Sequence, residues 1–338
     1  MRAWWIGEPG AIDGGPLRRG ERPDPTPGPG EILVRVSMCG VCRTDLHLAE
    51  GDLLPHHADT VPGHEIVGRV EAMGAGARRF PTGQRVGIAW LRRTCGRCRF
   101  CRAGRENLCL TPMFTGWDAD GGFAELAVVD EEYAYALPDG FADAEAAPLL
   151  CAGIIGYRAL KRAAVPPGGR LGIYGFGASA HLAAQVALAE GAEVHVFTRS
   201  AAARRLALEL GASSAGGADD ETPVLLDSAI LFAPTGELVP VAMRALDRGG
   251  TLAVAGIHLT DVPSLRYSTD LFQEKQLRSV TANTRRDGEE FLALASQLGV
   301  RPHVSVRGFD ELDSVLRDLA HDRVTGAAVI DVSGSGSD

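Results

Sequence analysis

The sequence predicts an α/β fold whose two parts differ in texture. From residue 1 to about 150 the chain is rich in glycine and proline, and short alternating runs at 32–36, 65–70 and 123–129 predict an irregular, mostly β region. After about residue 153, strand and helix patterns alternate. Alternation of this kind predicts a parallel sheet with helices on both of its faces.

The second part is predicted to contain strands and helices of ordinary length. Glycines close both of its clear helices, as expected where a helix ends in a left-handed residue. The stretch 171–189 lacks Asp, Glu, Lys and Arg, but its glycines favour strand, turn and helix over a membrane span. The predicted strands are 171–174, 194–198, 229–232, 251–257 and 278–282, and the predicted helices are 178–190 and 200–210, closed by Gly191 and Gly211.

The carboxyl-terminal residues predict two more helices. Asp287-Gly-Glu-Glu290 resembles a capping box that opens a helix with Phe291 on its apolar face. A second helix is expected from about Asp310. This segment could rejoin the first part of the chain, which would make that part discontinuous.

Composition and charge exclude several classes of protein. The chain has 338 residues, 45% of them hydrophobic, which suffices for substantial cores in two domains. A formal net charge of −9 argues against nucleic acid or an anionic membrane surface as the main partner. The amino terminus lacks a basic segment followed by an apolar stretch, so we expect no secretory signal and a cytoplasmic location. These features favour an enzyme that acts on a small molecule.

Four of the seven cysteines lie close together in the sequence. Six arginines between residues 92 and 105 would offset the negative charge of the four cysteine thiolates and lower the pKa values of these thiols. Nucleic-acid binding through these arginines is the alternative, which the scarcity of interleaved aromatic residues disfavours. Four thiolates at this spacing can close a tetrahedron around Zn²⁺, and such a saturated site is structural. The cluster comprises Cys95, Cys98, Cys101 and Cys109.

The other three cysteines, Cys39, Cys42 and Cys151, are scattered. Together with His64, Cys42 and Cys151 offer three ligands and leave a fourth position free for water or substrate. Catalytic zinc is held by three protein ligands with an open position. The sequence therefore predicts two zinc ions per chain, one structural and one catalytic.

A glycine pattern that follows a predicted strand and opens a predicted helix indicates a dinucleotide site. Gly175 permits the tight turn, Gly177 lets the backbone approach a pyrophosphate, and Ala180 keeps helix and strand close. The predicted cofactor contacts in this loop are Gly175, Gly177, Ala178, Ser179 and Ala180.

The end of the next strand is expected to contact the adenosine ribose. A carboxylate there would bond the ribose 2′-hydroxyl and repel a 2′-phosphate, but no acid is present. Thr198 and Ser200 can donate hydrogen bonds, and Arg199, with Arg204 one turn further on, can pair with a phosphate. NADP(H) is therefore favoured over NAD(H), although either would bind if Arg199 points into solvent. The predicted contacts are completed by Gly256 and Ile257, at the end of the predicted strand 251–257.

Motifs spread over nearly the whole chain carry a family resemblance. They are Cys39-Gly-Val-Cys42-Arg-Thr-Asp-Leu-His47, Pro62-Gly-His64-Glu65, Cys95-Gly-Arg-Cys98, Gly121-Gly-Phe123-Ala-Glu125 and Cys151-Ala-Gly153. Together they resemble the zinc-dependent alcohol dehydrogenases of the medium-chain dehydrogenase/reductase superfamily. The resemblance implies a GroES-like, mostly β catalytic domain at 1–153 and 288–338 and a Rossmann domain at 154–287, with the chemistry in the cleft between them.

The resemblance also implies which residues hold the catalytic zinc. It assigns the first ligand to Cys42 and leaves Cys39 as a small apolar neighbour. His64 and Cys151 complete the trio. Glu65 resembles a carboxylate that approaches the metal as a transient ligand while other ligands exchange.

Further roles follow from the same resemblance. Asp45 resembles the acid that orients the ligating imidazole. In the oxidative direction the alcohol would lose its proton through Thr44, then the nicotinamide ribose, then His47 to solvent. Arg43 resembles a residue that meets the pyrophosphate, and a solvated arginine is the alternative.

The expected substrate pocket is apolar. Trp90 and Trp117 occupy positions that resemble its walls, although core packing would explain each almost as well. Such a pocket suits primary alcohols or aldehydes with an alkyl or aryl body. The sequence departs from the family at Ile154 and Ile155, where hydroxyl residues are often found, and at 326–328, where many relatives carry a pyrophosphate-binding arginine.

The expected activity is oxidoreduction of an alcohol and aldehyde pair with NADP(H), by a homodimer or homotetramer. A polyol or secondary-alcohol dehydrogenase and a double-bond reductase are alternatives within the superfamily. The zinc ligands count against the reductase, because such reductases commonly lack them. A zinc and dinucleotide sensor without turnover is an alternative from another class, and the presence of Thr44 and His47 argues against it.

Overall fold

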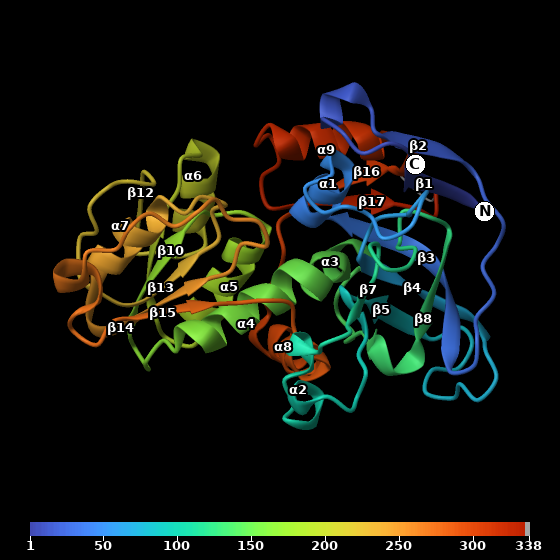
Figure 1. Ribbon diagram of the computed structural model, residues 1–338, viewed down its shortest axis with the longest axis horizontal. Coiled ribbons are helices and arrows are strands. Elements are labelled where there is room, and N and C mark those ends of the chain that lie inside the picture. The colour runs from blue at the N-terminus through green and yellow to red at the C-terminus, as the bar shows by residue number, and fades with distance from the viewer. Residues whose placement is uncertain (335–338) are drawn as a thin grey trace. The chain divides into compact units, whose positions relative to one another are not determined.

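The computed structural model describes residues 1–334 and confirms the predicted α/β fold (Figure 1). The chain forms two compact units. The first comprises Met1–Cys151, Ala282–Ser296 and the described residues from Pro302 onward, and the second comprises Ala152–Thr281 and Gln297–Arg301. Within residues 1–334, no helix is both long and apolar enough to cross a membrane.

A mainly antiparallel sheet forms the centre of the first unit. Its strands follow the order β16-β17-β3-β4-β5-β9, and β8 also pairs with β3. The long central strand β3 alternates buried and exposed positions along part of its length, so one face packs on the core. The strands are β3 (Glu31–Val41), β4 (Glu65–Met73), β5 (Arg85–Ile88), β8 (Leu126–Asp130), β9 (Ala134–Ala136), β16 (Val304–Gly308) and β17 (Ala327–Asp331).

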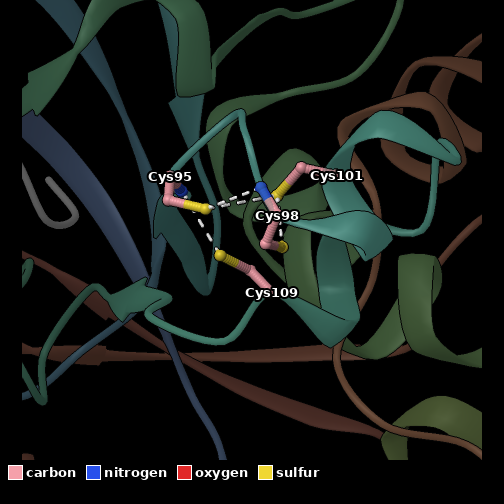
Figure 2. Close-up of side chains that lie close together, drawn as sticks. All are labelled: Cys95, Cys98, Cys101 and Cys109. Carbon is pink, nitrogen blue, oxygen red and sulfur yellow. Dashed lines mark hydrogen bonds between the residues drawn. The ribbon is translucent and has the colours of Figure 1, made fainter.

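Short hairpins and helices surround this sheet. The helix α2 (Arg99–Arg102) belongs to a lobe that carries the four clustered cysteines (Figure 2). The other elements of the first unit are the pairs β1 (Arg2–Ile6) with β2 (Leu17–Glu21) and β6 (Leu91–Arg93) with β7 (Met113–Phe114), and the helices α1 (Arg43–Glu50), α3 (Asp143–Pro148), α8 (Arg285–Leu298) and α9 (Leu312–Ala320).

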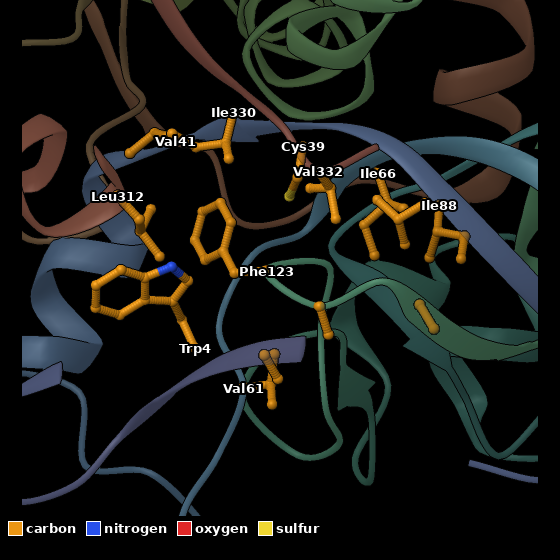
Figure 3. Close-up of a cluster of buried hydrophobic side chains, with 14 of the residues drawn as sticks. Trp4, Cys39, Val41, Val61, Ile66, Ile88, Phe123, Leu312, Ile330 and Val332 are labelled. Atoms are coloured by element: carbon orange, nitrogen blue, oxygen red, sulfur yellow. The ribbon is translucent and has the colours of Figure 1, made fainter. Parts of the chain in front are cut away.

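Residues from both ends of the chain build the core of the first unit. Ile330 of β17 lies opposite Cys39 of β3, and Leu312 of α9 joins Trp4 and Phe123 in one buried cluster (Figure 3). The indole Nε1 of Trp4 donates a hydrogen bond of 2.8 Å to the carbonyl oxygen of Phe309, so the buried polar group is satisfied. The carboxyl-terminal segment therefore completes the sheet and core that the amino-terminal segment begins.

The predicted capping box of helix α8 is wrong by one turn. The helix begins at Arg285, and Thr284 caps it: Asp287 N–H donates to Thr284 Oγ1 at 3.1 Å, and Thr284 N–H donates to Asp287 Oδ2 at 2.9 Å. The reciprocal pair is thus Thr284 with Asp287, three residues apart as a capping box requires. Phe291 lies fully buried on the helix that Thr284 caps.

A six-stranded, wholly parallel sheet forms the second unit. Its order is β12-β11-β10-β13-β14-β15. Counted along the chain from β10, this is 3-2-1-4-5-6, the strand order of the Rossmann fold. The elements are α4 (Ile154–Ala163), β10 (Arg170–Tyr174), α5 (Ala178–Ala189), β11 (Glu193–Phe197), α6 (Ala201–Glu209), β12 (Ser214–Gly216), β13 (Leu226–Leu231), α7 (Leu238–Ala245), β14 (Leu246–Val254) and β15 (Gln276–Ser279).

The direction of strand succession reverses between β10 and β13. Because crossovers between parallel strands are right-handed, the helices that follow β10 and β13 cover opposite faces of the sheet. The predicted strand 251–257 ends earlier than expected, at Val254, which is the last residue of β14 paired with β13. Gly256 and Ile257 therefore lie in the loop after β14 and not in the strand.

Candidate functional site

The four clustered cysteines converge on one point (Figure 2). Their sulfur atoms all lie within 4.8 Å of one another, and Cys98 Sγ is 3.5 Å from Cys101 Sγ. Cys98 directly precedes α2 and Cys101 lies one turn along it, while Gly96 adopts a positive φ of 66° that turns the chain between the first two ligands. Four thiols at these separations form the donor set that zinc prefers in a saturated site.

Backbone amides stabilise thiolates in this cluster. Cys98 N–H donates to Cys95 Sγ at 3.4 Å, and Cys95 N–H donates to Cys109 Sγ at 3.3 Å. Amide hydrogen bonds from Cys101 and Leu110 lower the pKa of the Cys98 thiol to about 6. Burial raises the pKa of the Cys101 thiol to about 11. The lobe is thus arranged to hold sulfur in its charged, metal-binding form at some positions before a metal arrives.

A second cluster joins residues that are far apart in sequence. The ligand atoms of Cys42, His64, Glu65 and Cys151 all lie within 4.8 Å of one another, and the Sγ atoms of Cys42 and Cys151 are 4.0 Å apart. Cys42 precedes helix α1, Glu65 opens β4, and Cys151 lies on a single π-helical turn, Leu149–Gly153. Gly63, with a positive φ of 97°, turns the chain just before His64. The residues predicted as catalytic ligands are therefore brought together.

Asp45 holds this cluster in place. Its side chain is fully buried, and its Oδ2 accepts a hydrogen bond of 2.8 Å from Cys42 N–H in the capping box of α1. Its Oδ1 accepts a hydrogen bond of 3.0 Å from Gly63 N–H and lies 3.3 Å from His64 Nδ1. One carboxylate therefore fixes the backbone beside two candidate ligands and faces the imidazole of one of them.

The imidazole of His64 is the clearest indication of a missing partner. It is 1% exposed, and neither of its ring nitrogens has a hydrogen-bond partner, although Nδ1 lies 3.3 Å from the Asp45 carboxylate. A buried polar atom without a partner costs free energy unless a ligand satisfies it. Because Nε2 lies among two sulfur atoms and a carboxylate, the residues present fit a zinc ion.

The ionisable groups of this cluster influence one another strongly. The hydrogen bond between the two thiols, together with His64, places the pKa of the Cys42 thiol well below its ordinary value. The same hydrogen bond, together with burial, raises the pKa of the Cys151 thiol. Burial raises the pKa of Glu65, and the neighbouring Cys42 raises it further. Burial alone would lower the pKa of His64, but Asp45 and Cys42 together raise it. A divalent cation would relieve this concentration of negative charge.

Stacked aromatic rings adjoin His64. Trp90 lies 4.9 Å from the His64 ring in an edge-on arrangement, and it stacks against Trp117 at 5.8 Å and Phe114 at 4.8 Å. Trp90 is 8% exposed, whereas Trp117 and Phe114 are half-buried. The structure thus places Trp90 beside a candidate ligand and Trp117 against the far side of this aromatic stack. Sequence reasoning missed Phe114, because β7 has two residues and no readable period.

Helix α1 carries the other predicted catalytic residues. Thr44 is 5% exposed, with Oγ1 3.7 Å from Cys42 Sγ. His47 lies one turn further along, and its Nδ1 is 2.8 Å from Asp52 Oδ2. Arg43 forms an ion pair with Asp322, just beyond helix α9. Neither carboxylate was predicted, since each approaches α1 from a loop with no recognisable motif.

The predicted dinucleotide loop lies between β10 and α5. Gly175 has a positive φ of 84°, and a Cβ there would approach the backbone nitrogen of Ala233 to 2.7 Å, so only glycine fits. A Cβ on Gly177 would meet no atom within 4 Å, which leaves room for a ligand at the start of the helix. Ala178 and Ser179 are half-buried in the first turn, and Ala180 is fully buried.

The predicted ribose-binding residues follow β11. Ser200 caps helix α6, where its Oγ accepts a hydrogen bond of 3.2 Å from Ala203 N–H. Arg204 donates from Nη1 to the carbonyl oxygens of Thr198, at 2.8 Å, and Arg199, at 3.0 Å. Arg199 itself is exposed, and Thr198 is 8% exposed. Arg204 therefore secures the backbone at the end of β11.

The structure also places Ile257 and the two alanines at which the sequence departs from the family. Ile257 is 53% exposed in the loop after β14. Ala327 and Ala328, at the place of the arginine found in many relatives, are buried in β17.

Comparisons with known proteins agree with this geometry. Residues 28–139 match the alcohol dehydrogenase GroES-like domain. The chain is 57% identical to a probable alcohol dehydrogenase of Mycobacterium tuberculosis over 98% of this chain and 97% of the other. The chain belongs to the zinc-type, medium-chain alcohol dehydrogenase family. The resemblance found in the sequence is thereby confirmed.

More distant relatives of this alcohol dehydrogenase share the whole fold. An alcohol dehydrogenase of Geobacillus stearothermophilus is 36% identical over 89% of this chain and 91% of the other. A solved cinnamyl alcohol dehydrogenase of Sorghum bicolor superposes with a TM-score of 0.89 at 28% identity, covering 100% of this chain and 99% of the other. CAD from Helicobacter pylori, solved with NADP(H), gives 0.89 at 26% identity, covering 99% and 100%. The protein is an oxidoreductase of the alcohol dehydrogenase class.

Proposed function

We propose that this alcohol dehydrogenase interconverts primary alcohols and aldehydes at a zinc ion held by Cys42, His64 and Cys151. The observation that carries the proposal is the buried Nε2 of His64, which has no hydrogen-bond partner and lies among two thiols and a carboxylate. Zinc bound there would supply a Lewis acid for the substrate oxygen. Glu65 is the proposed transient ligand.

The proposed proton path runs along helix α1. Thr44 would accept the proton of the alcohol at Oγ1 while its own hydroxyl proton leaves by way of the nicotinamide ribose to His47, which would pass a proton towards solvent. The 43% exposed side chain of Asp52, which is 2.8 Å from His47 Nδ1, supports this direction of transfer. Asp45 keeps the His64 ring in the orientation that aims Nε2 at the ligand cluster. The stacked rings of Trp90, Phe114 and Trp117 would exclude water and accept an apolar substrate body.

A second zinc is proposed at Cys95, Cys98, Cys101 and Cys109. The support is the convergence of four thiols and the amide hydrogen bonds that charge them before metal binding. Four sulfur ligands leave no open position, so this zinc would stabilise the lobe and take no part in the reaction.

We assign cofactor binding to the second unit and the zinc sites to the first, in domains with limits near 154–287 and 1–153 with 288–338. NADP(H) is the proposed hydride partner, with NAD(H) as the weaker one, because no carboxylate follows β11 and Arg199 is exposed there. Gly175, Gly177 and the first turn of α5 would hold the pyrophosphate. Assembly into a homodimer or homotetramer is proposed as well.

One experiment tests the activity and the cofactor together. The zinc-loaded protein is incubated with a panel of alkyl and aryl aldehydes, and cofactor absorbance is followed with NADPH and NADH in parallel. We expect turnover that is faster with NADPH. Equal rates would remove the argument from Arg199, and a lack of turnover with every aldehyde and alcohol would favour a zinc and dinucleotide sensor instead.

A further inference from the structure

The carboxylate of Glu65 lies against a residue that has no side chain. Gly40, near the end of β3, is the register partner of Glu65, the first residue of β4. A Cβ built on Gly40 would overlap Glu65 Oε2 and would lie 2.8 Å from Glu65 Cδ and 2.9 Å from Glu65 Cβ. Real Cβ atoms do not approach other atoms so closely. The Glu65 carboxylate therefore occupies the space that any other residue at position 40 would fill.

The same carboxylate also faces the candidate ligands. One of its oxygen atoms lies within 4.8 Å of the ligand atoms of Cys42, His64 and Cys151. Glu65 is only 3% exposed, so a displaced carboxylate has no short route to solvent. It is confined between the backbone of Gly40 on one side and the ligand cluster on the other.

We propose that Gly40 is a positioning residue for Glu65. The missing side chain at position 40 leaves a resting place for the carboxylate, and this resting place sets how close the carboxylate comes to the catalytic zinc. With glycine, the carboxylate has room to move away from the cluster and leave the fourth ligand position to substrate. A methyl group at position 40 closes the resting place and drives the carboxylate into the cluster. The inference rests on the zinc site proposed above.

The atoms in the way make this change a specific one. Two of the three atoms nearest to a Cβ on Gly40, Oε2 and Cδ of Glu65, move when that side chain rotates, whereas Glu65 Cβ, at 2.9 Å, moves only with its strand. Gly68 provides a matched control in the same pair of strands, opposite Val36. A Cβ there would overlap the carbonyl oxygen of Arg35 and lie 2.7 Å from Val34 Cγ1, away from every candidate ligand. Gly40→Ala should therefore act on the metal site, and Gly68→Ala on the sheet alone.

The test measures the metal directly. Zinc release from Gly40→Ala, Gly68→Ala and the unaltered protein is followed with a chromogenic chelator, and the phase that Cys42→Ser lacks is assigned to the catalytic site. We expect this phase to be about tenfold slower in Gly40→Ala, because the carboxylate becomes a fourth ligand. After Co²⁺ substitution, the visible absorption bands of Gly40→Ala should shift, whereas those of Gly68→Ala should not.

Two outcomes would overturn the proposal. Release rates and Co²⁺ spectra that are the same in Gly40→Ala and Gly68→Ala would do so, and would leave the proposed zinc chemistry standing, because that depends on turnover by the unaltered protein. If Gly40→Ala does not fold, the double variant Gly40→Ala with Glu65→Gly decides, because it removes the carboxylate together with the Cβ that would lie 2.9 Å from the new methyl group. Removing the carboxylate should restore folding, and a double variant that also fails to fold would refute the resting place.

Discussion

The two cysteine-containing clusters of this protein are built in opposite ways. Cys95 to Cys109 form a cluster within one short stretch of chain, held by a loop and one helical turn. The Cys42 cluster draws its residues from the start of a helix, the start of a strand and a π-helical turn, with 109 positions between Cys42 and Cys151. The first depends on local geometry, whereas the second exists only when the whole first unit is folded.

This difference also separates their chemistry. The local cluster has four sulfur donors, and those of Cys95 and Cys109 accept hydrogen bonds from nearby amides. Its metal would be fully enclosed by ligands. The assembled cluster mixes sulfur, imidazole and a carboxylate, and it is backed by the fully buried Asp45. A site of mixed donors with one exchangeable member can admit a substrate. The local cluster would thus hold a metal ion with no open position, and the assembled cluster would hold the metal ion that reacts with substrate.

Removal of one ligand from the assembled cluster should produce the largest effect. Cys42→Ser is expected to lower kcat/KM by about 1000-fold, because the Lewis acid at the substrate oxygen is lost. The zinc content should fall from two ions to roughly one per chain, since the local cluster is untouched. Turnover and metal analysis of the purified variant measure both effects.

Cys39→Ala is the matched control for that variant. Cys39 is fully buried three residues away, and its thiol forms only a weak contact of 3.6 Å with the Gly40 carbonyl oxygen. Loss of its sulfur should cost about 1 kcal/mol of stability and leave both zinc ions bound. If Cys39→Ala lost zinc and Cys42→Ser kept it, the zinc ligand would be Cys39 and not Cys42.

Two thiols of the local cluster should be alkylated at different rates once the metal is removed. With pKa values of about 6 for Cys98 and about 11 for Cys101, Cys98 should be alkylated about 100-fold faster at pH 7. Peptide mass spectrometry after timed alkylation measures both rates. Because the pKa of Cys98 is lowered from 9.0, its stabilising contribution is complete above pH 9 and is lost as the pH falls through 6. Equal alkylation rates would contradict the contrast.

Asp45→Asn should weaken only the assembled cluster. The amide keeps the shape of the side chain but loses the charge that faces His64 and one of the two oxygens that accept from Cys42 N–H and Gly63 N–H, so zinc affinity there should fall by about tenfold. Chelator competition measures the affinity, and the Cys95 cluster in the same molecule is the internal control. Equal losses at both clusters would show that Asp45 supports the fold in general and not the ligand geometry.

The contrast between the local and the assembled cluster also explains how much of each could be predicted from the sequence. The spacing of Cys95, Cys98, Cys101 and Cys109 is a property of the sequence, and their convergence needs no knowledge of the fold. Spacing alone could not choose between Cys39 and Cys42, because both precede helix α1 closely. The choice came from family resemblance, and the structure shows Cys39 fully buried in the hydrophobic core on β3.

Residues that act through tertiary contact could not be predicted. Asp52 reaches His47 from a loop, Asp322 reaches Arg43 from a distant turn, and Phe114 joins the tryptophans from a two-residue strand. None of these has a period or a motif. Gly40 stood within a recognised motif, but its role became visible only when the opposite strand placed Glu65 upon it. The Rossmann strands were predictable because their apolar runs and closing glycines are local signals.

The smallest effect on turnover is expected from the local cluster. Cys98→Ser removes a ligand whose loss should release the structural zinc, yet activity at 25 °C should change by about twofold at most, because the assembled cluster keeps all its ligands. The cost should appear in stability: loss of metal-binding free energy is expected to lower the midpoint of thermal unfolding by about 10 °C. Differential scanning calorimetry, with zinc analysis and turnover on the same sample, measures all three. If Cys98→Ser abolished turnover in a folded protein that retains one zinc, the two clusters would be coupled, and the separation of stability from reactivity would fail.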